Sequence, residues 1–81
     1  MNIDELRGKL EYLGIPKTVY SFHGDGIGEC FVIVHEAKGW LVYYSERGQR
    51  NGVNIFDTEN EACDFLLNWI LSDRTVQKNI T

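Results

Sequence analysis

The most prominent feature of the hydrophobic pattern is a pair of apolar runs, Cys30–Val34 and Trp40–Tyr44. Both runs are rich in β-branched and aromatic residues, which favour strands, and Ala37–Gly39 between them favours a turn. The pattern predicts a β-hairpin over Glu29–Arg47. Because the apolar residues are consecutive, both faces of this hairpin carry apolar side chains. Two helices can cover one face of a small sheet, so the pattern leaves open what covers the other face.

Apolar residues at helical spacing predict one helix at each end of the chain. Ile3–Leu13 carries a narrow apolar stripe, with Asn2 as its N-cap and Gly14 as its stop signal. The second helix is predicted to begin after Thr58, which fits a capping box with Glu61. Its apolar arc is wider than one sheet can cover, so the first helix is expected to cover the remainder.

Two further strands are predicted, one on each side of the hairpin. Thr18–His23 is rich in strand-forming residues and precedes the glycine-rich segment Gly24–Gly28, which is predicted to turn the chain back into the hairpin. Asn51-Gly52 is a preferred pair for a type I′ turn. Val53–Phe56 is predicted to follow that turn as a short fourth strand at the edge of the sheet.

Together these elements predict an α+β fold. It consists of an N-terminal helix, an antiparallel meander sheet of three to four strands, and a C-terminal helix packed on one sheet face. Neither a repeat nor a linker divides the sequence. We therefore expect a single α-β-β-β-(β)-α domain over residues 1–73, followed by a polar tail over residues 74–81 that frays.

Charge and composition narrow the class of partner and the compartment. Twelve acidic residues against eight basic ones give a net charge of −4, which repels a phosphate backbone and suits a basic protein. Met1–Glu5 has no basic segment followed by an apolar one, and no apolar run is long enough to cross a membrane. We therefore expect a cytoplasmic protein with no membrane contact. Cys30 and Cys63 are expected to be reduced core residues.

Alternation along the strands sorts the sheet side chains into two faces, provided that Lys38-Gly39 closes the hairpin and that His23 pairs with Glu29. The almost wholly apolar face is expected to lie beneath the helices, and the mixed face is expected to point outward. The apolar face holds Tyr20, Phe22, Cys30, Val32, Val34, Leu41 and Tyr43. The mixed face holds His23, Glu29, Phe31, Ile33, His35, Trp40, Val42, Tyr44 and Glu46.

Several residues on the mixed face could in principle carry chemistry. Its two histidines and two glutamates are acid–base candidates, but an open sheet face does not exclude water and no nucleophile motif adjoins them. Cys30 and His35 lie five residues apart on one strand, hence on opposite faces, which is unsuitable for zinc. The alternating glycines of Gly24–Gly28 precede a strand and not a helix, unlike a phosphate-binding loop. We expect no catalytic residue, no metal and no cofactor.

The aromatic residues of the second apolar run allow two interpretations. Trp40 and Tyr44, with the nearby Arg47 and Arg50, could stack bases, which makes a small RNA- or single-stranded-DNA-binding module the alternative. Tryptophan, tyrosine and arginine also dominate protein–protein hot spots, and this interpretation tolerates the acidic neighbours. We expect a protein partner on the mixed face, or a homodimer that buries it, and the alternative is that Trp40 and Tyr44 pack under the loops or the tail of the same chain. The expected contacts are His35, Trp40, Val42, Tyr44, Glu46, Arg47 and Arg50.

The segments Gly39–Gly48 and Glu61–Leu67, with Phe56 between them, resemble small immunity proteins of bacterial polymorphic toxin systems. The resemblance extends over Tyr20–Asp73. It implies a non-enzymatic inhibitor, encoded beside a contact-dependent or secreted toxin, that binds the C-terminal domain of that toxin in the cytoplasm. A basic, nuclease-like toxin domain would suit the net charge of −4. No residue takes a role from the resemblance.

Overall fold

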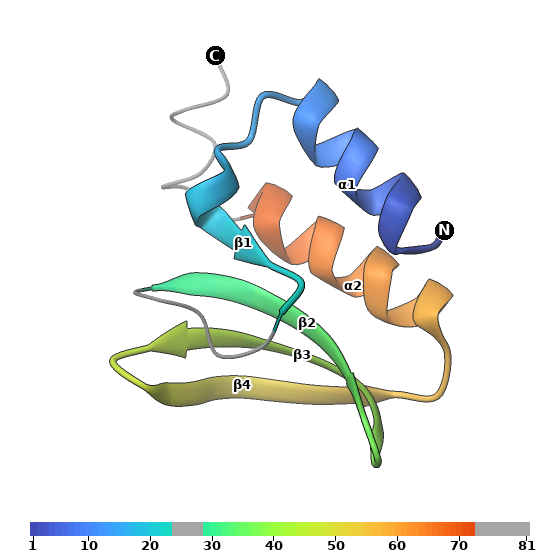
Figure 1. The fold of residues 1–81 in the computed structure, drawn as a ribbon, viewed down its shortest axis with the longest axis vertical. Coiled ribbons are helices and arrows are strands. Elements are labelled where there is room, and N and C mark those ends of the chain that lie inside the picture. Colours follow the sequence, from blue (N-terminus) through green and yellow to red (C-terminus); the bar gives the residue numbers. More distant parts are fainter. Residues whose placement is uncertain (24–28, 73–81) are drawn as a thin grey trace.

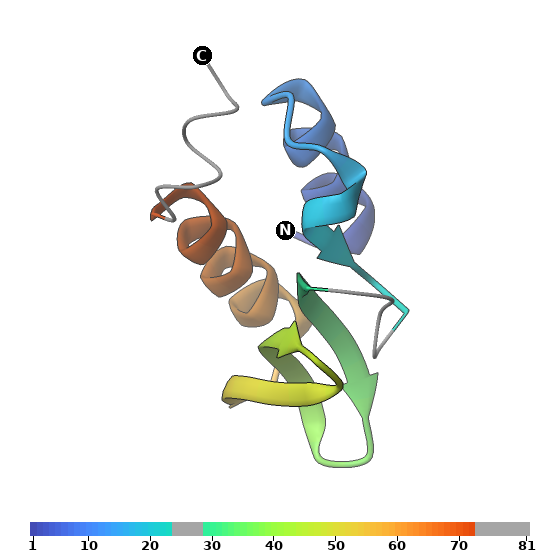
Figure 2. The same ribbon diagram turned by 90° about the vertical axis from the view of Figure 1, so that its left-hand side faces the viewer.

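In the computed structural model, which describes residues 1–23 and 29–72, two helices lie on one side of a four-stranded sheet (Figures 1 and 2). The strand order is β1-β2-β3-β4. The elements are α1 (Ile3–Tyr12), the 3₁₀ turn η1 (Lys17–Val19), β1 (Tyr20–Ser21), β2 (Cys30–Glu36), β3 (Gly39–Glu46), β4 (Gln49–Phe56) and α2 (Glu59–Ser72). The predicted α+β fold, with the C-terminal helix packed on the sheet, is confirmed. The predicted glycine-rich turn and the polar tail lie outside the described residues.

Local signals place the helix ends as predicted. The Glu5 N–H donates to the Asn2 side chain at 2.9 Å, and the Asn2 N–H donates to the Glu5 carboxylate at 3.3 Å, which completes a capping box. Gly14, at φ +75°, supplies the left-handed residue that ends α1. At the start of α2 the Glu61 N–H donates to Thr58 Oγ1 at 3.2 Å. Side chains near each helix start thus satisfy part of its unpaired backbone.

The first strand differs from the prediction. β1 is only two residues long and runs parallel to β2, with Tyr20 beside Phe31 and Ser21 beside Val32. The preceding residues form η1, in which the Val19 N–H donates to the Pro16 carbonyl at 3.0 Å. Parallel neighbours cannot be joined by a tight hairpin, so the expected antiparallel first hairpin was wrong. The sheet is mixed, with three antiparallel strands and one short parallel strand.

The central hairpin forms, but its turn lies one residue earlier than predicted. Glu36 pairs with Gly39, so Ala37-Lys38 and not Lys38-Gly39 makes the turn. The register therefore shifts by two residues. Because side chains alternate with a period of two, this shift leaves each residue of β2 and β3 on the same face as the same neighbours.

The turn between β3 and β4 also lies earlier than predicted. Glu46 pairs with Gln49, and the turn residues Arg47 and Gly48 have φ of +51° and +77°, as a type I′ turn requires. β4 therefore begins four residues earlier than predicted. The register between β3 and β4 shifts at Gly52, whose φ is +64°, so the predicted turn residue instead forms a bulge inside the strand.

The helices cover the face that was expected to point outward, so the assignment of the two faces was wrong. Phe31, Ile33 and Val42 are buried in one cluster with the apolar side chains of α1 and α2. The physical reason is the size of the aromatic side chains on this face. α2 places Trp69 against the sheet, and the Trp69 ring packs edge-on against the Phe31 ring, with the ring centres 5.0 Å apart. The expected position of Tyr20 and Phe22 beneath the helices is confirmed, because β1 pairs in parallel with β2 and sets Tyr20 beside Phe31.

We predict opposite effects from adding a methyl group at two glycines. Gly39 has φ +129°, and a Cβ there would lie 2.7 Å from the Phe56 carbonyl oxygen, so Gly39→Ala should lower the free energy of unfolding by more than about 1 kcal/mol. Gly8 lies within α1 with nothing within 4 Å of an added Cβ, so Gly8→Ala should raise it by about 0.5–1 kcal/mol. Urea denaturation measures both. Equal stability of the two variants would contradict the placement of Gly39.

Candidate partner-binding surface

Three of the residues predicted to bind a partner are buried or half-buried on the helix side of the sheet. Val42 has no exposed surface, so its predicted role as a contact is wrong. Tyr44 is half-buried and its ring packs edge-on against Phe31, with the centres 5.0 Å apart. Trp40 is half-buried as well, and the His35 ring stacks on it at 4.5 Å with an interplanar angle of 6°. Packing of the core accounts for most of the surface of these aromatic rings.

The other four predicted contacts are exposed, but they do not form one patch. His35 lies at one end of the central hairpin, paired with Trp40. Glu46 and Arg47 lie at the other end of β3, beside the last turn. Six residues of strand separate Trp40 from Glu46, which corresponds to roughly 20 Å. A partner that touches all of these residues would have to extend along the whole strand.

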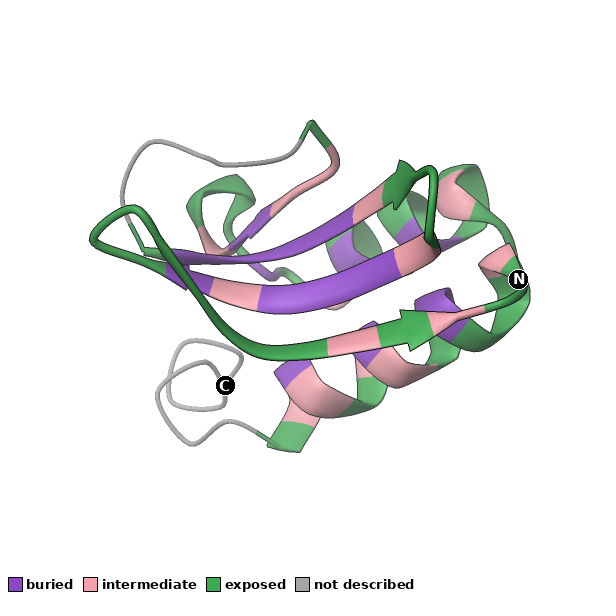
Figure 3. Cartoon of the chain, turned by 90° about the horizontal axis from the view of Figure 1, so that it is seen from below, coloured by how far each residue is buried: buried purple, intermediate pink, exposed green. Residues whose placement is uncertain are grey.

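The sheet face away from the helices, here called the open face, has its own small apolar cluster. Its buried members are Cys30, Val32, Leu41 and Tyr43, with Val34 packed against them. Figure 3 views the molecule from below and shows that this burial follows β2 and β3, whereas most of β4 is exposed. Apolar residues on both faces of the hairpin, as predicted, are therefore a property of the fold.

An arginine from β4 lies across the open face. The Arg50 guanidinium sits 4.7 Å from the centre of the Tyr43 ring and donates two hydrogen bonds to the Glu36 carboxylate, at 3.3 and 3.2 Å. Planar guanidinium groups favour this combination of ring stacking and bidentate pairing. Arg50 was predicted as a partner contact, and its position gives it a structural role in covering Tyr43.

Two apolar side chains on β4 remain exposed beside this cluster. Ile55 is 52% exposed and pairs with Leu41, which places it on the open face. Val53, 43% exposed, lies in the bulged segment two residues earlier. We call Val53 and Ile55 the β4 rim. Both residues were predicted only as part of a strand, although the alternation of apolar and polar residues in an edge strand is a signal that identifies exposed apolar side chains.

The starts of the two helices form an acidic end of the molecule. The Ile3 N–H donates to Glu59 Oε2 at 2.7 Å, so the first turns of α1 and α2 lie side by side, as Figure 1 also shows. Carboxylates in these turns interact favourably with the helix dipoles. The exposed acidic residues at this end are Asp4, Glu5, Asp57, Glu61 and Asp64.

The two core thiols are protonated at neutral pH. Burial raises the pKa of the Cys30 thiol, and burial together with nearby Glu59 raises the pKa of the Cys63 thiol to about 11. Both cysteines are free and buried. Among residues 1–23 and 29–72, His, Cys, Asp and Glu form no group of three or more that could hold a metal ion. No helix in this part of the chain is long and apolar enough to cross a membrane.

Comparison with known proteins adds no assignment. No protein-family model, curated protein or solved structure matches the chain significantly. We define the candidate surface as the β4 rim and the charged side chains near it, which are Glu36, Arg47 and Arg50. Its definition rests on burial and contacts within this molecule.

Matched threonine substitutions test which side of the sheet is covered. Val42→Thr places a hydroxyl in the fully buried helix-side core and should lower the free energy of unfolding by about 1–3 kcal/mol. Ile55→Thr lies in the exposed rim and should change it by only about 0.5 kcal/mol. Urea denaturation followed by circular dichroism gives both values. A larger loss for Ile55→Thr would contradict the observed arrangement.

The raised pKa of Cys63 predicts loss of stability in alkali. The folded protein keeps this thiol protonated up to a pKa of about 11, whereas an unfolded thiol ionises near 9.0, so the stabilising contribution is present below pH 9 and is lost as the pH rises toward 11. Cys63→Ala should therefore show a shallower decline in urea midpoint between pH 8.5 and pH 10.5, values chosen to bracket the lower pKa. Identical pH profiles for the two proteins would contradict this.

Proposed function

We propose that this chain is an immunity-type inhibitor that binds and neutralises a cognate bacterial toxin domain by direct, non-covalent contact in the cytoplasm. The proposal combines the resemblance described above with one structural observation, the β4 rim. Val53 and Ile55 are 43% and 52% exposed on an edge strand, next to a second apolar cluster on the sheet face away from α1 and α2.

The rim has the composition of an interface centre. Apolar anchors surrounded by charged and polar side chains are typical of protein–protein hot spots, and Arg50, Glu36 and Arg47 provide such a border here. A stable interface buries about 800 Å² on each partner, more than two side chains supply. The contact is therefore expected to continue from the rim along β4 and the last turn, which includes Glu46.

The charge distribution supports a basic partner. The chain carries a net charge of −4, and exposed carboxylates gather where both helices begin. Such a field speeds the association of a positively charged partner and weakens with salt. Many nucleic-acid-cleaving domains need a basic surface, so a nuclease-like toxin would be attracted by the acidic charge of this chain.

Two alternatives differ in how the structure bears on them. The base-stacking interpretation loses support, because Trp40 and Tyr44 pack on the helix side of the sheet. A homodimer keeps one supporting observation, since β4 is an edge strand with exposed apolar side chains that a second copy could cover. Light scattering after gel filtration distinguishes a monomer from a homodimer. A dimer that the substitution Ile55→Lys dissociates would favour the homodimer over the toxin inhibitor.

We predict that positive charge at the β4 rim weakens toxin binding. The Val53→Lys/Ile55→Lys variant should bind the toxin domain encoded by the adjacent reading frame at least tenfold more weakly, a loss of about 1.4 kcal/mol in isothermal titration calorimetry. Tyr12→Lys is the matched control, because Tyr12 is 90% exposed on α1, away from the rim.

Equal affinity of the double variant and the wild type would contradict the placement of the interface. If the adjacent frame encodes no toxin and the chain protects no cell against one, the proposed function itself is contradicted.

A further inference from the structure

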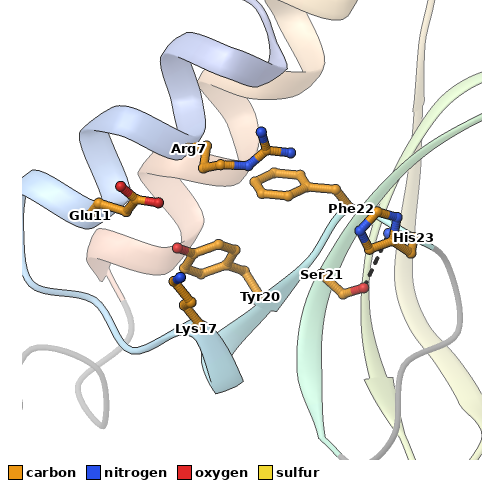
Figure 4. Close-up of a pocket in the computed structure, with 7 residues that line it drawn as sticks. All are labelled: Arg7, Glu11, Lys17, Tyr20, Ser21, Phe22 and His23. Atoms are coloured by element: carbon orange, nitrogen blue, oxygen red, sulfur yellow. Dashed lines mark hydrogen bonds between the residues drawn. The ribbon is translucent and has the colours of Figure 1, made fainter.

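A cleft separates α1 from the short strand β1, on the side of the molecule away from the β4 rim. Its volume is about 410 Å³, which falls within the range of small-molecule sites. Arg7 and Glu11 reach it from α1, Lys17 from η1, and Tyr20 and Phe22 from β1 and the residue that follows it (Figure 4).

One wall of the cleft holds an unusual polar atom. Tyr20 is only 8% exposed, and its hydroxyl is the one buried side-chain N or O atom among the described residues that has no hydrogen-bond partner. A buried hydroxyl without a partner destabilises a fold, whereas phenylalanine would fill the same space without this penalty. The packing of Tyr20 on Phe22, with ring centres 5.4 Å apart, does not need the hydroxyl.

The other polar groups of the cleft are mostly donors. Among the described residues that line the cleft, Arg7 and Lys17 bring two positive charges and Glu11 brings one negative charge, which is the reverse of the acidic balance of the whole chain. Ser21 and His23 are the remaining polar residues of this lining. The Arg7 guanidinium lies 5.0 Å from the centre of the Phe22 ring and contacts Asp4 at 3.5 Å, an exposed and therefore weak pair. An excess of donors over acceptors selects a ligand rich in acceptor oxygens.

From these observations we propose that the cleft between α1 and β1 binds a small organic anion, with a carboxylate or phosphate head accepting from Tyr20 and Lys17 and an apolar body against Phe22. Lys17 and Glu11 are both exposed, so their side chains are able to turn aside and open the way to the hydroxyl. Burial raises the pKa of Tyr20, with Glu11 adding to the rise and Arg7 opposing it, so the phenol keeps its proton and donates at neutral pH.

The charges predict the sign of each substitution. Lys17→Gln and Tyr20→Phe should each weaken binding about fivefold, because each removes a donor to the anion. Glu11→Gln should strengthen binding, because Glu11 carries the negative charge among the described residues that line the cleft. Tyr20→Phe should leave the melting temperature unchanged or higher, since the lost hydroxyl has no partner in the fold.

The experiment is an NMR titration of the full chain with benzoate and with phenyl phosphate, and with benzamide as the uncharged control. Amide shifts that saturate at Tyr20 and Phe22 with an anion, and not with benzamide, support the site, and the stronger anion identifies the head group. Inorganic phosphate and acetate test whether the apolar body contributes.

The proposal is overturned if neither aromatic anion shifts these amides at millimolar concentration. It is also overturned if binding persists unchanged in Tyr20→Phe and Lys17→Gln, or if Tyr20→Phe lowers the melting temperature without changing the affinity. The proposed toxin interface is unaffected by any of these outcomes, because the cleft and the β4 rim share no residue.

Discussion

The packing of Trp69 against Phe31 decides how the rest of the molecule is arranged. The rings meet edge to face with their centres 5.0 Å apart, and Tyr44 meets the other side of the cluster in the same way. The helix side presents Phe31, Trp40 and Tyr44, whereas the open face presents Tyr43 among smaller cysteine, valine and leucine side chains. Aromatic rings bury the larger area, so α2 gains most by docking on the side that holds more of them. Gly52 permits the close approach, since a Cβ there would lie 3.2 Å from the Trp69 ring.

Because both helices lie on the aromatic side of the sheet, the apolar side chains of the open face are shielded by other residues. Arg50 provides part of it, by lying over Tyr43 and holding Glu36 through two hydrogen bonds. Its aliphatic stem and planar head shield an apolar ring while the charge stays near water. Val53 and Ile55, farther along the same strand, remain 43% and 52% exposed.

The two proposed sites follow from features that the fold does not need. An exposed isoleucine on an edge strand favours association, and an unpaired buried hydroxyl lowers stability, so neither is explained by folding alone. The sites also lie on different elements, the rim on β4 and the cleft between α1 and β1. The two proposals are therefore compatible, because a protein partner at the rim and a small anion in the cleft could bind at the same time.

Local sequence by itself determined the caps of both helices and the two rows of side chains along the hairpin, because capping and alternation depend on near neighbours. It did not determine which row lies beneath the helices, since alternation is the same for either face. Nor did it show that Tyr20 pairs in parallel with Phe31, or that Arg47-Gly48 forms the last turn. Tertiary packing decided these points, because only contacts between distant segments distinguish one face or register from another.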